Sequence, residues 1–188
     1  MNWVFIAGPA CIVLAPLLVL WVCYNGLVEQ RNKARQALSG IYVQLKRRAD
    51  LIPNLVEVVK GYAKHERGVF DRVAKLRLTL LAATKTDAIA LEQVAKEMSE
   101  TLSRLVAVAE AYPDLKASAN YRKLQEELAE TEDQIAAARR IYNANVAEYN
   151  TTTEQFPSIL VAGWFQFAPL AFFTEDAAAN QVPAVAGI

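Results

Sequence analysis

His65 and Glu66 are the first residues of the chain whose types could support chemistry. A histidine beside a carboxylate can bind a metal ion or transfer a proton. A zinc hydrolase helix needs a second histidine four residues later, but Val69 occupies that position. A di-iron bundle needs two Glu-x-x-His pairs, and His65 is the only histidine. We therefore expect no catalytic residue, metal ion or cofactor, and interpret the pair as polar residues at a bundle layer or on its surface.

A second group of residues combines acidic and basic side chains at helical spacing. Charges at such spacing usually form ion pairs on or between helices, each contributing about 0–1 kcal/mol when exposed. The alternative is a charged face that docks another subunit or a different protein. The candidate interaction residues are Arg47, Arg48, Asp50, Glu57, His65, Glu66, Glu132, Arg139 and Arg140.

Two Tyr-Asn pairs, Tyr142-Asn143 and Tyr149-Asn150, are seven positions apart. This spacing places them on one side of a helix. We expect them to hydrogen-bond across a helical bundle, with ligand binding as the alternative.

The elements that position these residues are predicted to be long amphipathic helices, because apolar residues recur every three or four positions. Asp50 looks like the N-cap of a new helix, with Pro53 in its first turn. Stripes of this length are best buried in an antiparallel four-helix bundle, so the predicted fold class is all-α. The four helices are expected at about 27–49, 50–83, 87–112 and 120–150.

Residues 3–24 contain no charged side chain and are predicted to form a transmembrane helix. A helix of this length extends about 33 Å, enough for a hydrocarbon core of about 30 Å. Trp3 at one end and Trp21 and Tyr24 at the other suit the two membrane interfaces. The alternative, a cleaved signal peptide, lacks a basic segment before the run and a clean cleavage site after it.

Basic residues follow this run, beginning with Arg31, Lys33 and Arg35, and none precedes it. The positive-inside rule then predicts an N-terminus outside and a bundle in the cytoplasm. Arg31 is expected to lie near anionic lipid headgroups.

Residues 156–173 form a second uncharged run, with six aromatic side chains. Three interpretations stay open: packing on the bundle, self-association, or contact with the membrane interface through Trp164, Phe165 and Phe167. The expected organisation is a transmembrane helix at 3–24, a bundle domain at 25–155, the aromatic segment at 156–173 and a flexible tail at 174–188.

The charge balance limits the choice of partners. Lys plus Arg and Asp plus Glu number 20 each in a chain of 188 residues, so nucleic acid is not an expected partner. The two cysteines, Cys11 and Cys23, both lie in the N-terminal apolar run and give no disulfide framework for the rest of the chain.

The chain resembles the LemA family of bacterial membrane proteins in three places. These are YNGLVEQRNKARQALSGIYVQLKRRADLIPNLVEVVKGYAKHE from Tyr24, AYPDLKASANYRKLQEELAETEDQIAAARRIYNANVAEYN from Ala111, and FPS at 156–158 with the later Phe172-Phe173. The resemblance implies one N-terminal membrane helix, four main helices and a place in the bacterial inner membrane. It implies no particular activity.

The functional prediction is a membrane-anchored scaffold or interaction protein that contacts the lipid bilayer, forms homo-oligomers and is not an enzyme. One alternative is a sensor or adaptor that relays a membrane or envelope signal to a protein partner. A third interpretation is an enzyme with an unfamiliar site around His65, Glu66 and Glu132.

Overall fold

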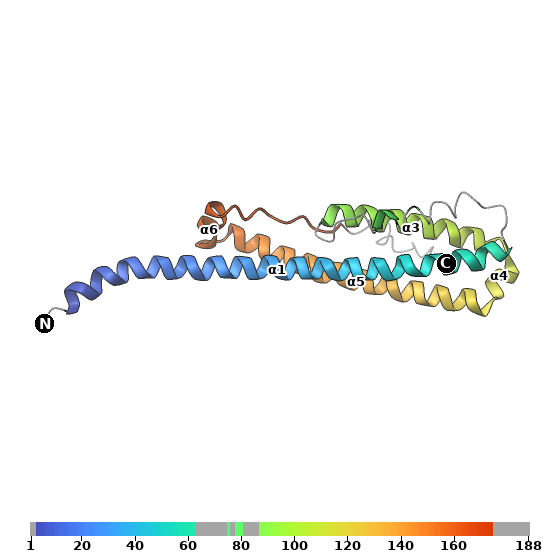
Figure 1. Cartoon of the computed structure of the whole chain (residues 1–188), viewed down its shortest axis with the longest axis horizontal. Coiled ribbons are helices and arrows are strands. Elements are labelled where there is room, and N and C mark those ends of the chain that lie inside the picture. Colours follow the sequence, from blue (N-terminus) through green and yellow to red (C-terminus); the bar gives the residue numbers. More distant parts are fainter. Residues whose placement is uncertain (1–2, 63–74, 76–77, 81–86, 175–188) are drawn as a thin grey trace, which may run out of the picture. The chain divides into compact units, whose positions relative to one another are not determined.

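The computed structural model describes residues 3–62, 75, 78–80 and 87–174, including all their side chains except those of residues 3–13 and 62. Within these ranges, all of the regular secondary structure is α-helical, which confirms the predicted all-α class. The helices labelled in Figure 1 are α1 (Trp3–Tyr62), α3 (Ala88–Glu110), α4 (Pro113–Ala117), α5 (Ala119–Glu154) and α6 (Ser158–Trp164).

The chain divides into two compact units. The first consists of Met1–Ala37 and Ile141–Phe172, and the second of Leu38–Arg140 and Phe173–Ile188. Helices α1 and α5 each contribute residues to both units, because each continues through the sequence boundary between them.

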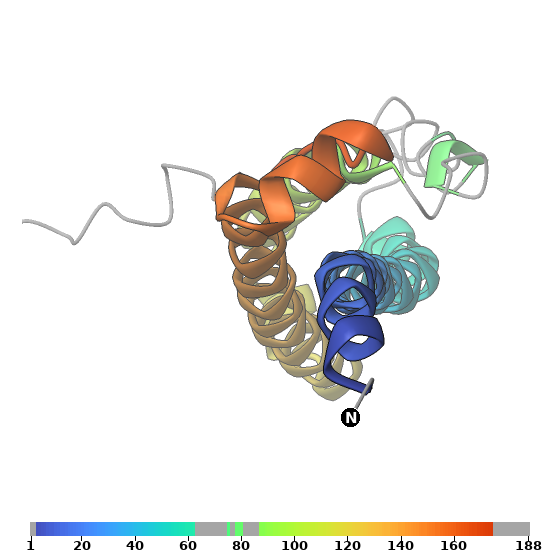
Figure 2. The same ribbon diagram turned by 90° about the vertical axis from the view of Figure 1, so that its left-hand side faces the viewer.

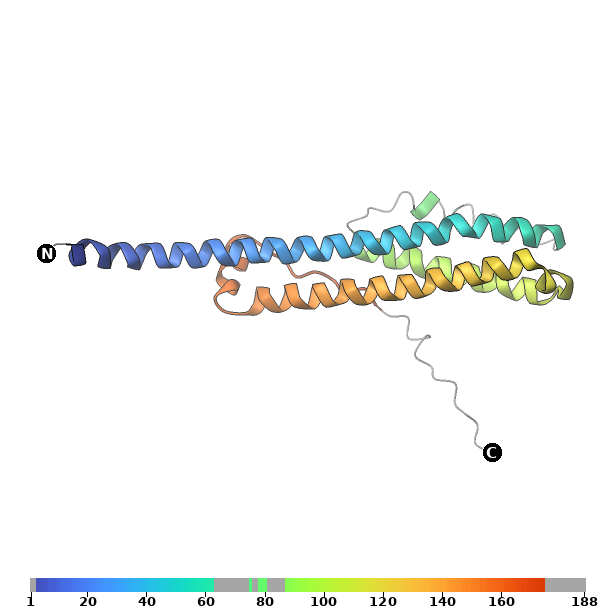
Figure 3. The same cartoon turned by 90° about the horizontal axis from the view of Figure 1, so that it is seen from below.

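Helix α1 runs for 60 residues without a break, as Figure 3 shows from blue to cyan. The predicted helix start at Asp50 is therefore wrong. A proline inside a helix removes a hydrogen bond and costs about 3 kcal/mol, but the buried stripe keeps its helical phase past Pro53. Ile52, Leu55 and Val59 are all at most 2% exposed, and their burial offsets the local cost.

Helix α3 lies within about two residues of its predicted bounds. It begins where the sequence predicts because the carboxylate of Asp87 accepts hydrogen bonds from the backbone N–H groups of Ile89 and Ala90, at 3.0 and 3.1 Å. Its apolar residues at helical spacing, including Leu91, Met98 and Leu105, are buried, whereas Leu102 on the same face is only half-buried. Pro113 follows the end of α3 and opens the five-residue α4.

Helix α5 continues to Glu154, through the three threonines where the sequence predicts its end. The hydroxyls of Thr152 and Thr153 donate to the carbonyls of Glu148 and Asn150, at 2.9 and 2.6 Å. Threonine can satisfy its hydroxyl on the preceding turn in this way and so remain helical. The chain then turns into α6, drawn in orange-red beyond the end of α5 in Figure 2.

Among the described residues, no helix combines the length and the apolar character that crossing a bilayer requires. The transmembrane helix predicted at 3–24 is thus not borne out, and these residues form the beginning of α1.

Candidate functional site

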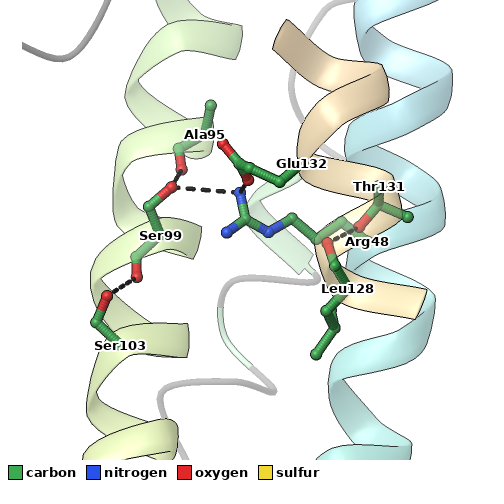
Figure 4. Close-up of polar contacts among 7 residues, drawn as sticks. All are labelled: Arg48, Ala95, Ser99, Ser103, Leu128, Thr131 and Glu132. Atoms are coloured by element: carbon green, nitrogen blue, oxygen red, sulfur yellow. Dashed lines mark hydrogen bonds and ion pairs between the residues drawn. The ribbon is translucent and has the colours of Figure 1, made fainter. Parts of the chain in front are cut away.

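Three helices of the second unit meet at Arg48. Its Nη1 lies 2.7 Å from Oε2 of Glu132 on α5 and donates to Oγ of Ser99 on α3 at 3.3 Å (Figure 4). Arg48 is only 4% exposed, although arginine is among the residues least often buried. A guanidinium enclosed by three helices is the most unusual polar group in the described part of this unit.

The helical phase of α1 places Arg48 inside. Leu45 and Ile52, one turn before and after it, are 0% and 2% exposed and lie on the same buried face. On α3, the hydroxyl of Ser99 donates to the carbonyl of Ala95 at 3.1 Å. Because that hydroxyl has a single hydrogen, its oxygen is left to accept from Arg48.

The charge at Arg48 is incompletely compensated. Burial lowers the pKa of the Arg48 guanidinium, Glu132 raises it and nearby Arg139 lowers it further. Arginine nevertheless stays protonated in proteins. The contact with Glu132 is close but lacks hydrogen-bond geometry, and Nε of Arg48 has no partner among the described protein atoms.

A groove of about 530 Å³ runs beside Arg48 and is formed mainly by α3 and α5. This volume lies in the range of small-ligand sites. Its apolar lining comes from Leu102, Val106, Ala107, Leu128 and Ala129, and its polar lining from Arg48, Ser99, Ser103, Glu110, Gln125 and Glu132. The half-burial of Leu102 is thus explained by its place in this groove.

The polar lining of the groove includes two serine hydroxyls and the charged side chains of Arg48, Glu110 and Glu132. Its two serine hydroxyls, on Ser99 and Ser103, donate to backbone carbonyls at 3.1 and 2.9 Å, and neither contacts a basic side chain that could accept its proton. The arrangement offers a cation, two carboxylates and an apolar floor, which suits a partner carrying complementary charges.

The other predicted interaction residues are more dispersed. Arg47 pairs with Glu130 at 3.5 Å, with both side chains about half exposed. Asp50, Glu57 and Arg140 are exposed. His65 and Glu66 lie outside the described residues.

Arg139 and Ser99 show what spacing alone did not reveal. The Arg139 guanidinium lies over the ring of Phe173, 5.1 Å from its centre, and forms a cation–π contact with it. This contact is not predicted from the sequence. Ser99 was missed entirely, because a single serine on a mostly apolar helix face gives no signal of its own.

The first unit contains a separate aromatic cluster, in which α6 packs on α1 and α5. Its buried members are Leu27, Tyr149, Val161, Ala162 and Phe167. Tyr24 of α1 contacts the rings of Phe165 and Phe167 edge-on, with centroids 4.8 and 5.7 Å apart. The 156–173 segment therefore packs on its own chain, which was one of the three interpretations left open.

Phe167, predicted to contact the membrane, is buried at 6% exposure. Gln166 adopts a left-handed conformation with φ of 55°, and this turns Phe167 back so that its N–H donates to the carbonyl of Ala162 at 3.0 Å. A left-handed residue followed by this backbone bond is typical of the Schellman motif that ends many helices. The guanidinium of Arg31 lies 4.8 Å from the centre of the Phe167 ring.

The Tyr-Asn pairs hold the chain that follows α6. The Tyr149 hydroxyl donates to Ala168 O at 3.0 Å, and Tyr142 donates to Ala171 O at 2.8 Å. The Asn150 side chain makes two bonds of 2.9 Å with the backbone of Leu170, one as donor and one as acceptor. Tyr142, Tyr149 and Asn150 therefore form hydrogen bonds as predicted, and the bonds given above go to the segment that follows α6.

Large apolar side chains remain exposed around this cluster. Trp164 is 76% exposed and Phe165 49%, and on α1 Trp21 is 66% exposed. The side chain of Trp3 lies outside the described residues, and Tyr24 is half-buried.

Comparison with known proteins gives this chain relatives across most of its length. It is 26% identical to magnetosome protein MamQ of Magnetospirillum gryphiswaldense and 28% identical to MamQ 1 of Paramagnetospirillum magneticum, each match covering 89% of this chain and 71% of the relative. It is 27% identical to protein LemA of Metamycoplasma hominis over 79% of this chain and 68% of that protein. The sequence model of the LemA family matches residues 37–186, which confirms the resemblance found in the sequence: the chain belongs to the LemA family.

Proposed function

We propose that this protein is a membrane-attached helical scaffold, which acts by binding other proteins, including further copies of itself, and catalyses no reaction. The observation that carries the proposal is the surface of α1 between residues 14 and 22.

All residues from 14 to 19 are exposed. Six consecutive helical positions, at about 100° each, cover the whole circumference of the helix. Leu14, Leu17 and Leu18 are 56–63% exposed, and no charged residue precedes Glu29. A helix that is apolar on all sides is normally buried in a protein core or in lipid. Attachment to a bilayer through this part of α1 would cover that surface.

The names of the relatives support a role without catalysis. Two are named for the magnetosome and one for the LemA family, and none of these names states a reaction. We infer that this chain, like these relatives, acts by binding other molecules.

The protein is proposed to attach to the bacterial inner membrane with its second unit in the cytoplasm. This orientation follows from the cations beyond the apolar stretch. An impermeant maleimide tests it on the variant Lys96→Cys, at an exposed position of α3, in a background with Cys11→Ala and Cys23→Ala. Labelling should require permeabilised cells. Labelling of intact cells would show that the second unit lies outside the cytoplasm and would contradict the proposed orientation.

The attachment itself is tested by fractionation after an alkaline carbonate wash. The full chain should remain in the membrane pellet, and Leu14→Gln, Leu17→Gln and Leu18→Gln together should release most of it. The proposal would be contradicted if the triple variant stayed in the membrane pellet, or if the full chain were found in the supernatant.

A matched control uses exposed apolar residues elsewhere on the chain. Val43, Ile89 and Ile141 are 58%, 69% and 59% exposed, comparable to the leucines of the test. Their combined substitution by Gln should leave the protein in the pellet, so that a general loss of apolar surface is separated from loss of the attachment surface.

Self-association is tested by light scattering of the full chain in detergent. A defined assembly of several copies supports the scaffold. A monomer at all concentrations would contradict self-association.

The second candidate function is an adaptor for a different protein, and the groove beside Arg48 favours it. Its lining combines apolar side chains with the carboxylates of Glu110 and Glu132, so a bound segment should carry a cationic group facing one of these carboxylates. Ala107→Trp and Ala129→Trp would fill the groove from exposed positions. Native mass spectrometry should show a stoichiometric complex with a different protein that these substitutions abolish; persistence of the complex would exclude this groove.

A further inference from the structure

We propose that α6 is an interfacial helix, which lies flat in the headgroup layer of the bilayer and inserts Leu160, Trp164 and Phe165 among the lipids. The proposal rests on the membrane attachment of α1 and adds a second, aromatic contact with a defined depth.

The composition of α6 is the first observation. Val161 and Ala162 face the buried cluster, at 5% and 7% exposure, while Leu160 and Trp164 are 58% and 76% exposed. An ordinary surface helix would place charged residues on its outer face. Here no charged residue occurs between Glu154 and Glu175, so α6 presents apolar side chains outward as well as inward.

The position of α6 along α1 is the second observation. Tyr24 is in edge-on contact with Phe165, with centroids 4.8 Å apart, and Leu20, Cys23 and Val28 pack on the same cluster. Helix α6 is therefore fixed beside residues 20–28 of α1, directly after the stretch that is apolar on all sides. If that stretch enters the bilayer, α6 must lie at the level where α1 leaves it.

The order of chemistry along α1 is the third observation. The apolar stretch is followed by Trp21 and Tyr24 with the aromatic α6, and then by Arg31, whose guanidinium lies 4.8 Å above the Phe167 ring. From Trp21 to Arg31 a helix rises about 15 Å. This sequence of hydrocarbon, aromatic belt and cations is the order found at the edge of a bilayer.

A lipid surface explains these observations better than a second copy of the chain. Phe165, which is 49% exposed, contacts Tyr24 just after the exposed stretch of α1, so a lipid surface that covers this stretch would also reach α6. Tryptophan and phenylalanine are also the residues that amphipathic helices use at lipid interfaces.

Tryptophan fluorescence of the full chain in vesicles tests the proposal. The variant with Trp3→Phe and Trp21→Phe retains Trp164 alone, and the variant with Trp3→Phe and Trp164→Phe retains Trp21 alone. Each is reconstituted in phosphatidylcholine and phosphatidylglycerol whose acyl chains carry bromine either near the headgroup or near the methyl end. Trp164 should emit at shorter wavelength than in water and be quenched at least twofold more by the shallow bromine than by the deep one.

The Trp21 variant separates this inference from the proposed function. Quenching of Trp21 without quenching of Trp164 would overturn the interfacial helix and leave the membrane attachment intact. Absence of quenching in both variants would overturn both. A third outcome is that the emission of Trp164 is shifted to shorter wavelength and depends on the ratio of protein to lipid, but is not quenched by bromine. This result would show that a second copy of the chain contacts α6, and it would overturn the inference.

A charge substitution gives a second test with a matched control. Leu160→Lys introduces a cation on the outer face of α6, and Ile141→Lys does so on α5 at nearly equal exposure, 58% against 59%. Leu160→Lys should reduce the shallow quenching of Trp164 at least twofold while the protein stays helical and in the membrane fraction. Equal quenching in both variants would contradict insertion of α6.

Discussion

Arg48 and Glu132 form an ion pair of 2.7 Å in which the arginine side chain is 5% exposed and the glutamate side chain 45%. The guanidinium has lost its water, while the carboxylate keeps part of its own. Desolvation of a buried ion costs several kcal/mol, and only close partners return it. The ion pair therefore adds little net stability, but without it Arg48 could not be buried.

Replacing Glu132 by Gln should destabilise the protein more than the loss of a surface ion pair would. Removing one partner of a fully buried pair costs about 3–5 kcal/mol, and we expect about 1–3 kcal/mol here because Glu132 is half exposed and Ser99 still accepts from Arg48. Chemical denaturation of the full chain in detergent, followed by circular dichroism, measures the free energy of unfolding.

Glu130→Gln is the matched control, two residues away on the same helix. Glu130 contacts Arg47 at 3.5 Å, with both side chains about half exposed, so its loss should cost no more than about 0.5 kcal/mol. Adding Arg48→Met to Glu132→Gln should recover most of the stability, because the uncompensated charge is then gone. Equal effects of the two glutamine variants would show that burial of Arg48 does not depend on Glu132.

Local signals in the sequence predicted the start of α3 well. Asp87 binds N–H groups two and three residues away, so everything needed to recognise the cap lies within one turn. The same rule failed at Asp50 and Pro53. There the local preference for a new helix is outweighed by the burial of Ile52, Leu55 and Val59 in an uninterrupted α1. The free energy of that burial depends on the tertiary structure and cannot be recognised in a short stretch of sequence.

The candidate site was only partly predictable for a similar reason. Spacing identified Arg48 and Glu132 as charged residues on helices, but it does not give the register of one helix against another. Their pairing and the role of Ser99 depend on that register. The burial of Phe167 depends on one left-handed residue, Gln166, which is not a type that marks such a turn.

Asn150→Asp should loosen the extended segment after α6. The amide of Asn150 both donates to and accepts from the backbone of Leu170, at 2.9 Å in each direction, and a carboxylate can only accept. Leaving a backbone carbonyl without its donor costs about 1–3 kcal/mol. Hydrogen exchange should show faster exchange around Leu170, whereas Thr151→Ala, at the exposed neighbouring position, should not change it. Unaltered protection in Asn150→Asp would mean that other contacts hold the segment.

Gln166→Gly should stabilise the end of α6. Gln166 is exposed and has φ of 55°, a conformation that costs a residue with a side chain about 1–2 kcal/mol and glycine almost nothing. Glycine also gains freedom in the unfolded chain, so we expect a net increase of about 0.5–1 kcal/mol in the free energy of unfolding. Gln166→Ala keeps the strain and should show no gain. A loss of stability in the glycine variant would show that the Gln166 side chain itself stabilises the turn.

Tyr142 should make the protein less stable at alkaline pH. Burial raises the pKa of the Tyr142 phenol above its ordinary value of about 10, because the interior disfavours phenolate. The folded state then retains a proton that the unfolded state has lost, so this contribution is complete below pH 10 and is lost as the pH rises through the folded pKa. Unfolding measured at a series of pH values should show a declining free energy from about pH 10, with a shallower decline in Tyr142→Phe. The same variant at pH 8 isolates the loss of its 2.8 Å hydrogen bond to Ala171 O, about 1 kcal/mol, from the effect of titration. Parallel declines in the two proteins above pH 10 would show that Tyr142 titrates alike in the folded and unfolded states.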